Sequence, residues 1–219
     1  MKRISLLAFF LVFFCSIVFP QQDVNPGVER WAIKTSLPDN PAEKNATIET
    51  LLALSNPITS ASEAPEDARI TQDADGFKEG TLVTTKAWLH LVALERDAKK
   101  HRDGDYHIQL RNSPEWGDSC FVVEIPDPDF IDDPTLKSEC ADARAFVKSK
   151  LLNDKEPGTR GNVMSHEVYV SVTGQLFFDA THLTGNPRGK KGNMKDPMHS
   201  YTCWELHPVT HMEFAAKPR

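Results

Sequence analysis

Three segments of the chain place a carboxylate close to an imidazole. The pairs are Asp105 with His107, Glu205 with His207, and Asp179 with His182. In the first two pairs the residues stand two apart, so on a strand both side chains project from one face. His211 has the parity to join the face of Glu205 and His207. Imidazole nitrogens and carboxylate oxygens suit zinc, manganese, iron or nickel, so these segments, if adjacent, would form a site for a divalent metal such as zinc.

The same pattern also fits a solvated surface. An antiparallel sheet that packs one face on a core commonly shows polar side chains to water from the other face. Solvation of these six side chains costs little, whereas burial of unpaired charges costs several kcal/mol each. The two interpretations differ in geometry, because the oxygen and nitrogen ligands of one zinc ion must all lie about 2.0 to 2.2 Å from it.

A glycine-rich loop between residues 185 and 195 carries a second candidate site. Its cations include Arg188, Lys190 and Lys191. Cations beside glycine amides can hold a phosphate or sulfate, and in an acidic chain this local reversal of charge favours an anionic ligand. The alternative is a solvated hairpin tip, which is the commoner role of such a loop.

The composition is that of a globular protein with an excess of acid. Hydrophobic residues make up 40% and charged residues 26% of the 219 residues, which favours one domain. Lys2 and Arg3 fall in a predicted signal segment. Without these two of the 25 Lys and Arg, 23 cations stand against 31 Asp and Glu, which gives a net charge of −8. Such a chain repels a phosphate backbone, so general nucleic-acid binding is disfavoured.

Residues 1–22 have the features of an export signal. Lys2 and Arg3 precede an apolar run from Ile4 to Phe19, which suits a signal peptide and is shorter than the ~20 residues of a spanning helix. The chain is therefore predicted to be secreted or periplasmic, in a bacterial envelope. Retention of the segment as an uncleaved anchor is the alternative, and it would be the protein's membrane contact.

Three cysteines follow this segment, namely Cys120, Cys140 and Cys203. In an oxidising compartment one pair is expected. Cys120 with Cys140 would close a loop of about 20 residues and contribute on the order of 3 kcal/mol. Motifs for other chemistry are missing from the sequence, which has no Cys-x-x-Cys, no Gly-x-Ser-x-Gly and no His-Glu-x-x-His.

The spacing of apolar residues divides the rest of the chain in two. Residues 23–80 predict an irregular arm, because their apolar content is too small for a separate core. Residues 81–219 predict a β domain, with a bend or bulge at Gly174. Helical spacing after Asp133 predicts one amphipathic helix over about residues 134–153. Alternating apolar residues predict strands near 83–93, 105–110, 120–125, 168–179 and 201–214.

Strands in an antiparallel meander, with one helix between the third and fourth, predict a small closed β-barrel. This is the arrangement of an oligonucleotide/oligosaccharide-binding (OB) fold, so the fold class is mainly β and OB-like. A β-sandwich of the immunoglobulin kind is the alternative, and it is disfavoured by the helix and by the small number of strands.

Five sequence blocks in consistent order span most of the chain after residue 22. They are ERWAIKT at 29–35, DGDYH at 103–107, EIPDP at 124–128, FFDATH at 177–182 and ELHPV at 205–209. With these blocks the chain resembles a group of secreted bacterial proteins of unassigned function. The resemblance implies secretion and a compact β domain, and it implies no particular reaction.

These features together predict a secreted or periplasmic β-barrel domain that binds a small-molecule or anionic ligand through its acid and histidine face. Two other functions stay open. A divalent-metal-dependent hydrolase would use the metal to acidify a water, with Asp105 or Glu205 as base. A structural envelope module would instead leave the three pairs apart and solvated.

Overall fold

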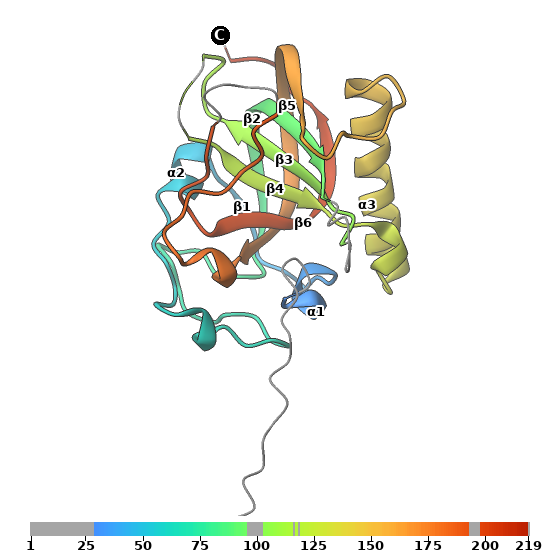
Figure 1. The fold of residues 1–219 in the computed structure, drawn as a ribbon. Coiled ribbons are helices and arrows are strands. Elements are labelled where there is room, and N and C mark those ends of the chain that lie inside the picture. Colours follow the sequence, from blue (N-terminus) through green and yellow to red (C-terminus); the bar gives the residue numbers. More distant parts are fainter. Residues whose placement is uncertain (1–28, 96–102, 116, 118, 193–197, 219) are drawn as a thin grey trace, which may run out of the picture.

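The computed structural model describes residues 29–95, 103–115, 117, 119–192 and 198–218 (Figure 1). The predicted signal segment at residues 1–22 lies outside this part of the chain. Within the described residues, five strands close into a barrel that is flanked by one long helix. The barrel strands are β2 (Leu82–Leu94), β3 (Tyr106–Arg111), β4 (Phe121–Ile125), β5 (Asn162–Phe178) and β6 (Trp204–Phe214).

The barrel closes because β5 pairs with a strand on each side. The hydrogen-bonded order is β2-β3-β4-β6-β5, and β5 also pairs with β2. Strands β2, β3 and β4 form an antiparallel meander, and β5 is antiparallel to both of its neighbours. This closed barrel, with a helix between its third and fourth strands, confirms the predicted OB-like fold. The β-sandwich alternative is wrong, since the strands form one closed sheet.

One strand pair departs from the prediction of a wholly antiparallel barrel. Strand β4 runs parallel to β6, with Val122 opposite Glu205 and Val123 opposite Leu206. A closed ring of five strands cannot alternate direction throughout, so closure itself requires a parallel pair. The barrel is therefore mixed, and the parallel pair places Glu205 beside β4.

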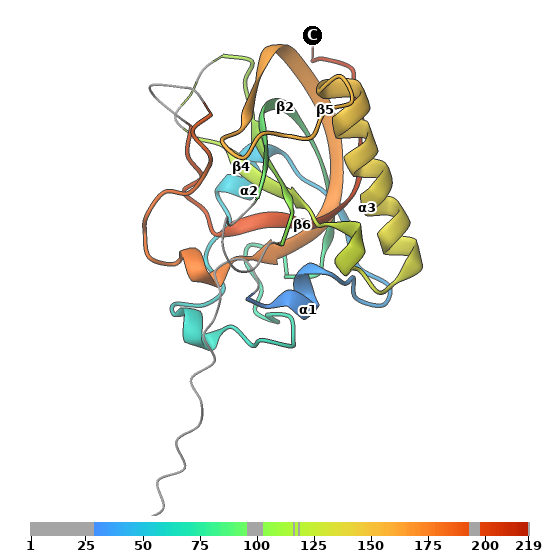
Figure 2. The same cartoon turned by 45° about the vertical axis from the view of Figure 1, so that its right-hand side comes forward.

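The long helix follows its predicted range closely. Helix α3 (Pro134–Phe146) continues as a π-helical turn over Val147–Leu151. Asp133 caps it, because its Oδ1 accepts a hydrogen bond from the backbone N–H of Leu136 at 2.8 Å. The helix packs along the outside of the barrel against β6 (Figure 2). Its length and composition, like those of every other helix among the described residues, are unsuited to a membrane crossing.

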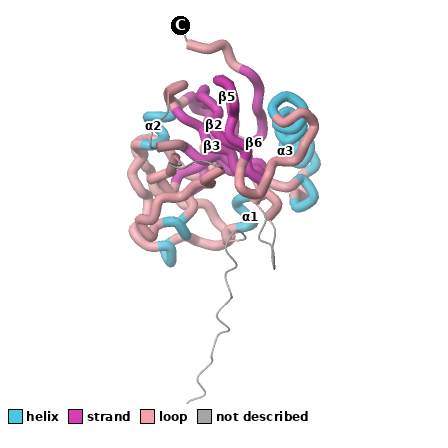
Figure 3. Tube along the Cα trace, turned by 45° about the horizontal axis from the view of Figure 1, so that its top comes forward, coloured by secondary structure: helices cyan, strands magenta, loops and turns pink. Residues whose placement is uncertain are grey.

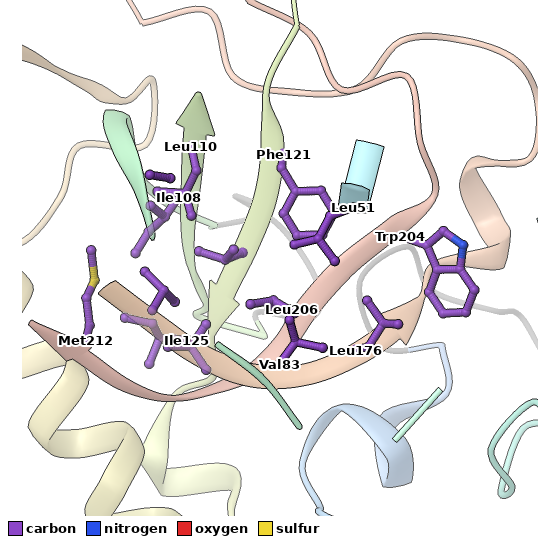
Figure 4. Close-up of a cluster of buried hydrophobic side chains, with 14 of the residues drawn as sticks. Leu51, Val83, Ile108, Leu110, Phe121, Ile125, Leu176, Trp204, Leu206 and Met212 are labelled. Carbon is purple, nitrogen blue, oxygen red and sulfur yellow. The ribbon is translucent and has the colours of Figure 1, made fainter. Parts of the chain in front are cut away.

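The barrel interior is filled by the apolar side chains of alternating strand positions (Figure 4). On β3 these are Tyr106, Ile108 and Leu110, and all three are fully buried. Trp204 lies at the edge of the cluster, where its Nε1 donates a hydrogen bond to the carbonyl oxygen of Ser55 at 2.9 Å. Burial of each large apolar side chain contributes about 1.5–3 kcal/mol. The core therefore fixes which face of each strand points inward, and the other face is left for polar residues.

Residues 29–80 form short elements joined by loops beside the barrel (Figure 3). Strand β1 pairs parallel with β2 at the edge of the sheet, and Ile48 and Leu51 join the barrel core. The elements of this arm are α1 (Trp31–Lys34), β1 (Glu43–Asn45), α2 (Ile48–Leu52) and the 3-10 turn Ala61–Glu63. Two further 3-10 turns, Pro128–Phe130 and Ala180–His182, lie within the barrel domain.

Gly174 allows β5 to bend where it meets β6. The pairing register of the two strands shifts on both sides of this residue, as expected for the predicted bulge. A Cβ atom here would lie 2.8 Å from the carbonyl oxygen of Pro208 and 3.1 Å from the Cα of Val209. Both are backbone atoms of β6, so the strand would have to shift.

We expect Gly174→Ala to lower the free energy of unfolding by about 1–3 kcal/mol, the usual cost of overpacking. Urea denaturation monitored by circular dichroism measures this loss. The control is Gly117→Ala, because a Cβ atom at Gly117 would meet nothing within 4 Å in the described structure. Equal stability of the two variants would contradict the close approach of β5 and β6.

The expected disulfide is not formed. Cys120, Cys140 and Cys203, the cysteines of the described residues, are all buried free thiols. Cys140 lies on α3 and belongs to the barrel core, with its Sγ 3.4 Å from the carbonyl oxygen of Val209. Cys120 instead accepts a hydrogen bond from Gln109 Nε2 at 3.1 Å. The prediction from sequence spacing is corrected because the two sulfurs have different partners on different elements.

Candidate functional site

The outward face of β3 and β6 is buried, although it is polar. Asp105 and His107 alternate with core residues at β3, and Glu205 and His207 alternate with core residues at β6, so all four point away from the barrel interior. Their exposed fractions are nevertheless only 1% to 5%. For these four residues the solvated-surface interpretation is therefore wrong.

Two buried cations from outside the barrel strands accompany this face. Lys34 of α1 is buried, and its Nζ lies 3.0 Å from Glu29 Oε1. Burial lowers the pKa of the Lys34 ammonium. Nearby carboxylates, among them Glu29 and Asp179, raise the pKa by a larger amount, so the net shift is upward. Arg188, from the loop between β5 and β6, is buried as well. Both cations therefore remain charged within the site.

His207 lies at the centre, with a carboxylate beside each ring nitrogen. Its Nδ1 is 3.2 Å from Glu205 Oε1 and 3.3 Å from Glu124 Oε2. Its Nε2 is 3.3 Å from Asp105 Oδ2. Burial lowers the pKa of His207, but hydrogen bonds to Glu124 and Glu205 and the charge of Asp105 together raise it to about 10. Without a bound cation this imidazole is therefore protonated at neutral pH.

Asp105 is a buried carboxylate without a hydrogen-bond partner among the described residues. It is 1% exposed, and neither of its oxygens accepts a hydrogen bond. His207 Nε2 lies 3.3 Å from Asp105 Oδ2, which is close enough for a hydrogen bond, but the contact does not have the direction of one. Burial raises the pKa of Asp105 to about 8 against the opposing charge of His207, and the charges of Asp103 and Glu124 add to the rise. A buried carboxylate left unpaired is costly, so Asp105 marks a position that a cation would stabilise.

Glu124 of β4 connects two histidines. Its Oε1 lies 2.7 Å from His107 Nδ1 and its Oε2 lies 3.3 Å from His207 Nδ1. Burial raises the pKa of Glu124, but hydrogen bonds from the two histidines hold it well below its usual range. Glu124 was not among the site residues predicted from the sequence. The available signal is its position as the only acid within the apolar strand from Phe121 to Ile125.

Asp179 and His182 do not reach this centre directly. Asp179 Oδ2 lies 2.6 Å from His182 Nδ1 and 3.0 Å from an Arg188 nitrogen. Arg188 also forms an ion pair with Glu205, which contacts His207. Burial raises the pKa of Asp179, but His182 and Arg188 lower it by more. The third predicted pair thus belongs to a chain of charges behind Glu205.

The three cations of the predicted anion site have different surroundings. Arg188 is engaged by Asp179 and Glu205, and Lys190 Nζ lies 2.7 Å from Glu95 Oε1. Lys191 is exposed. Two of the three side chains therefore neutralise the acids of this face, and anion binding by the loop stays a prediction.

His211 does not join the face of Glu205 and His207. Its side chain is 60% exposed and lies 3.7 Å from Glu213. Leu206, Val209 and Met212 all face the core, although each stands three residues from the next. Strand β6 therefore does not keep a strict two-residue alternation where its register with β5 shifts on both sides of Gly174, so residue parity does not place His211 beside Glu205 and His207.

Two overlapping groups of described residues can hold a metal ion. The first is Asp105, Glu124 and His207, and the second is Glu95, His107 and Glu124. In each group one ligand atom per residue lies within 4.8 Å of the others. The 3.3 Å between Asp105 Oδ2 and His207 Nε2 is close to the separation of about 3.4 Å between two ligands of a tetrahedral zinc ion with bonds of about 2.1 Å.

Comparison with known protein families and with curated proteins finds no match to this chain. A function therefore has to be argued from the chemistry of the site.

Proposed function

We propose that this protein binds a divalent transition-metal ion, of the zinc or manganese class, through Asp105, Glu124 and His207. The observation that carries the proposal is the Asp105 carboxylate, which is 1% exposed and has no hydrogen-bond partner among the described residues. It faces a histidine nitrogen at 3.3 Å, and potential ligand atoms of Asp105, Glu124 and His207 lie within 4.8 Å of one another. Mixed nitrogen and oxygen ligands are typical of these metals.

The charge balance of the site supports a dication. Three carboxylates contact His207, and a fourth, Asp179, lies behind Arg188, whereas two buried side chains of the site are positively charged. The carboxylates are Asp105, Glu124, Asp179 and Glu205, and the cations are Lys34 and Arg188. In the metal-free state the remaining negative charge is reduced by protons on His207 and Asp105, whose pKa values are raised to about 10 and about 8. A metal ion would take the place of these protons.

The surroundings of His207 also suit a metal ligand. Its Nδ1 can donate a hydrogen bond to Glu205 at 3.2 Å, which leaves the Nε2 lone pair for the metal. A carboxylate behind a ligating histidine is the usual arrangement, because it fixes the ring and its tautomer. Arg188 in turn holds Glu205 in place.

The location on the barrel supports ligand binding over a purely structural role. In OB-folds the ligand face is formed by the second and third strands, with the loops that join strands one to two and four to five. The corresponding elements here are β3, β4 and the loops on either side, between β2 and β3 and between β5 and β6. Glu124 and Arg188 come from these elements.

The test is metal binding by the purified, chelator-treated protein, measured by equilibrium dialysis against Zn²⁺ or Mn²⁺ with elemental analysis. We expect Asp105→Asn to weaken binding of the ion at this site by about 100-fold or more, since loss of second-shell partners alone costs 10- to 100-fold. Asp142→Asn is the matched control, because Asp142 is exposed on α3. Equal metal binding by Asp105→Asn and the wild type would overturn the proposal.

Export belongs to the same proposal and has its own test. The apolar run from Ile4 to Phe19 supports a secreted or periplasmic protein, and the measured N-terminus of the mature protein would decide between cleavage and anchoring. Hydrolysis is not included, because a substrate must reach the metal and the side chains of the three ligands are only 1% to 12% exposed.

A further inference from the structure

We infer that the site takes two divalent ions, bridged by Glu124, with the second ion held by Glu95 and His107. This inference rests on the proposed metal site and adds an outer ion to the inner one at Asp105, Glu124 and His207. The second group of potential ligands shares Glu124 with the first. The chemical class of the second ion is the same, because its ligands are again carboxylate oxygens and an imidazole nitrogen.

Strand pairing fixes the three outer ligands side by side. In the β3–β4 pair His107 lies directly opposite Glu124, and their Nδ1 and Oε1 atoms are 2.7 Å apart. Glu95 follows the end of β2, where its backbone N–H donates a hydrogen bond to the carbonyl oxygen of Asp105 at 2.8 Å. Its Oε1 lies 3.5 Å from the same His107 nitrogen.

The two carboxylate oxygens of Glu124 face different histidines. Its Oε1 faces His107 on the outer side, and its Oε2 faces His207 on the inner side. A carboxylate that binds one metal with each oxygen suits two-metal centres, in which the ions lie about 3.5–4 Å apart. The two groups of ligands are thus two halves of one centre.

His107 provides an observation independent of the acids. Its side chain is 6% exposed, and its buried Nε2 has no hydrogen-bond partner among the described residues. The ring is therefore fixed by hydrogen bonding only at Nδ1, and the proton of a neutral imidazole can reside on either nitrogen. An outer ion between Glu95 and Glu124 would replace the Nδ1 proton that His107 shares with Glu124, and the proton of the neutral ring would then reside on Nε2.

The outer position is more accessible than the inner one. Glu95 is 29% exposed, and its Oε1 lies 2.7 Å from Lys190 Nζ, which is 30% exposed. The lysine ammonium therefore competes with an outer ion for the same carboxylate. We expect the outer ion to bind more weakly than the inner ion and to exchange faster.

The experiment is a Mn²⁺ titration of the full chain, with stoichiometry from equilibrium dialysis and magnetic coupling from electron paramagnetic resonance. The wild type should bind two ions and show the coupled spectrum of a close pair. Glu95→Gln should bind one ion and lose the coupling, whereas Glu213→Gln, a change at an exposed acid, should leave both unchanged. Binding of a single ion by the wild type would overturn the second site and leave the first intact, and binding of none would overturn both.

A second pair of variants tests the outer position without removing a ligand. Lys190→Met removes the competing ammonium and should tighten binding of the second ion several-fold, while Lys191→Met should not, because Lys191 is the exposed neighbouring cation. Two coupled ions in Glu95→Gln, or weaker outer binding in Lys190→Met, would show that the outer ion does not lie at Glu95.

Discussion

Replacement of Glu79 by alanine should lower the free energy of unfolding by about 3–5 kcal/mol, the usual cost of breaking a buried ion pair from one side. Glu79 forms two hydrogen bonds of 2.6 Å with Arg30, and both side chains are at most 3% exposed. Its oxygens also accept hydrogen bonds from the backbone N–H groups of Ile70 and Phe178. The substitution would leave a buried guanidinium and two backbone donors without their acceptor.

The size of this effect follows from how completely Arg30 is bonded. Besides Glu79, its guanidinium donates hydrogen bonds to the carbonyl oxygens of Pro65, Ala68 and Phe178. These bonds hold the N-terminal arm against the barrel in a fully satisfied network, where removal of one member affects the rest. Thermal and urea denaturation of Glu79→Ala would measure the loss.

Glu167→Ala is the control for this prediction. Glu167 pairs with Lys217 at the surface, where both side chains are about half exposed, and such pairs contribute about 0–1 kcal/mol. A loss in Glu79→Ala no larger than that in Glu167→Ala would mean that the arm is not anchored by Arg30.

The buried pair of Arg30 and Glu79 also contributes to the candidate metal site. Arg30 lies over the ring of Phe177 at 5.0 Å, and Lys34 lies over the same ring at 5.6 Å. The ring of Phe177 is 5.8 Å from that of His207. The N-terminal arm thus places the buried Lys34 ammonium beside the acids around His207, and Arg30 contacts the same Phe177 ring. Loss of the Arg30–Glu79 pair should therefore also change the charge balance around His207.

The strand positions of the site were predictable from local spacing, but its burial was not. The two-residue spacing of Asp105 with His107 and of Glu205 with His207 correctly predicts that each pair shares a face, because strand geometry is local. The cover over that face comes from residues such as Lys34, which lies far away along the chain and carries no pattern that ties it to β3 or β6. Long-range packing of this kind leaves no periodic signal in one sequence.

The remaining differences between prediction and structure have similar causes. Glu124 is one acid in an apolar strand, so only the pairing of β4 with β3 shows that it faces His107. His211 was misplaced because two register shifts between β5 and β6 break the strict alternation of side chains along β6. The Cys120–Cys140 pair was inferred from distance along the chain, whereas disulfides depend on distance in space.

With metal removed, the protein should lose stability as the pH rises from neutral toward about 10. The pKa of His207 is raised from 6.5 to about 10 in the folded state, since its hydrogen bonds to Glu124 and Glu205 and the charge of Asp105 outweigh burial. A raised folded-state pKa contributes stability that is complete below 6.5 and is lost as the pH passes through about 10. Asp105, raised from 3.8 to about 8 mainly by burial, acts in the same direction over a lower range. The folded state binds more protons than the unfolded state here, so the unfolding free energy must fall with rising pH.

Metal binding should oppose this loss, because the ion replaces the protons that alkaline conditions remove. Urea denaturation across this pH range, with chelator and with saturating Zn²⁺ or Mn²⁺, measures both effects. The metal should stabilise the protein by about 2.7 kcal/mol at 100 times its dissociation constant, and the stabilisation should increase with pH until the metal hydrolyses. His207→Gln should reduce the alkaline loss of the metal-free protein and most of the metal effect, whereas His211→Gln should change neither, since His211 is 60% exposed. A metal-free stability profile that stays flat toward pH 10 would show that protons do not balance the buried carboxylates, and the charge argument for a metal at Asp105, Glu124 and His207 would lose its basis.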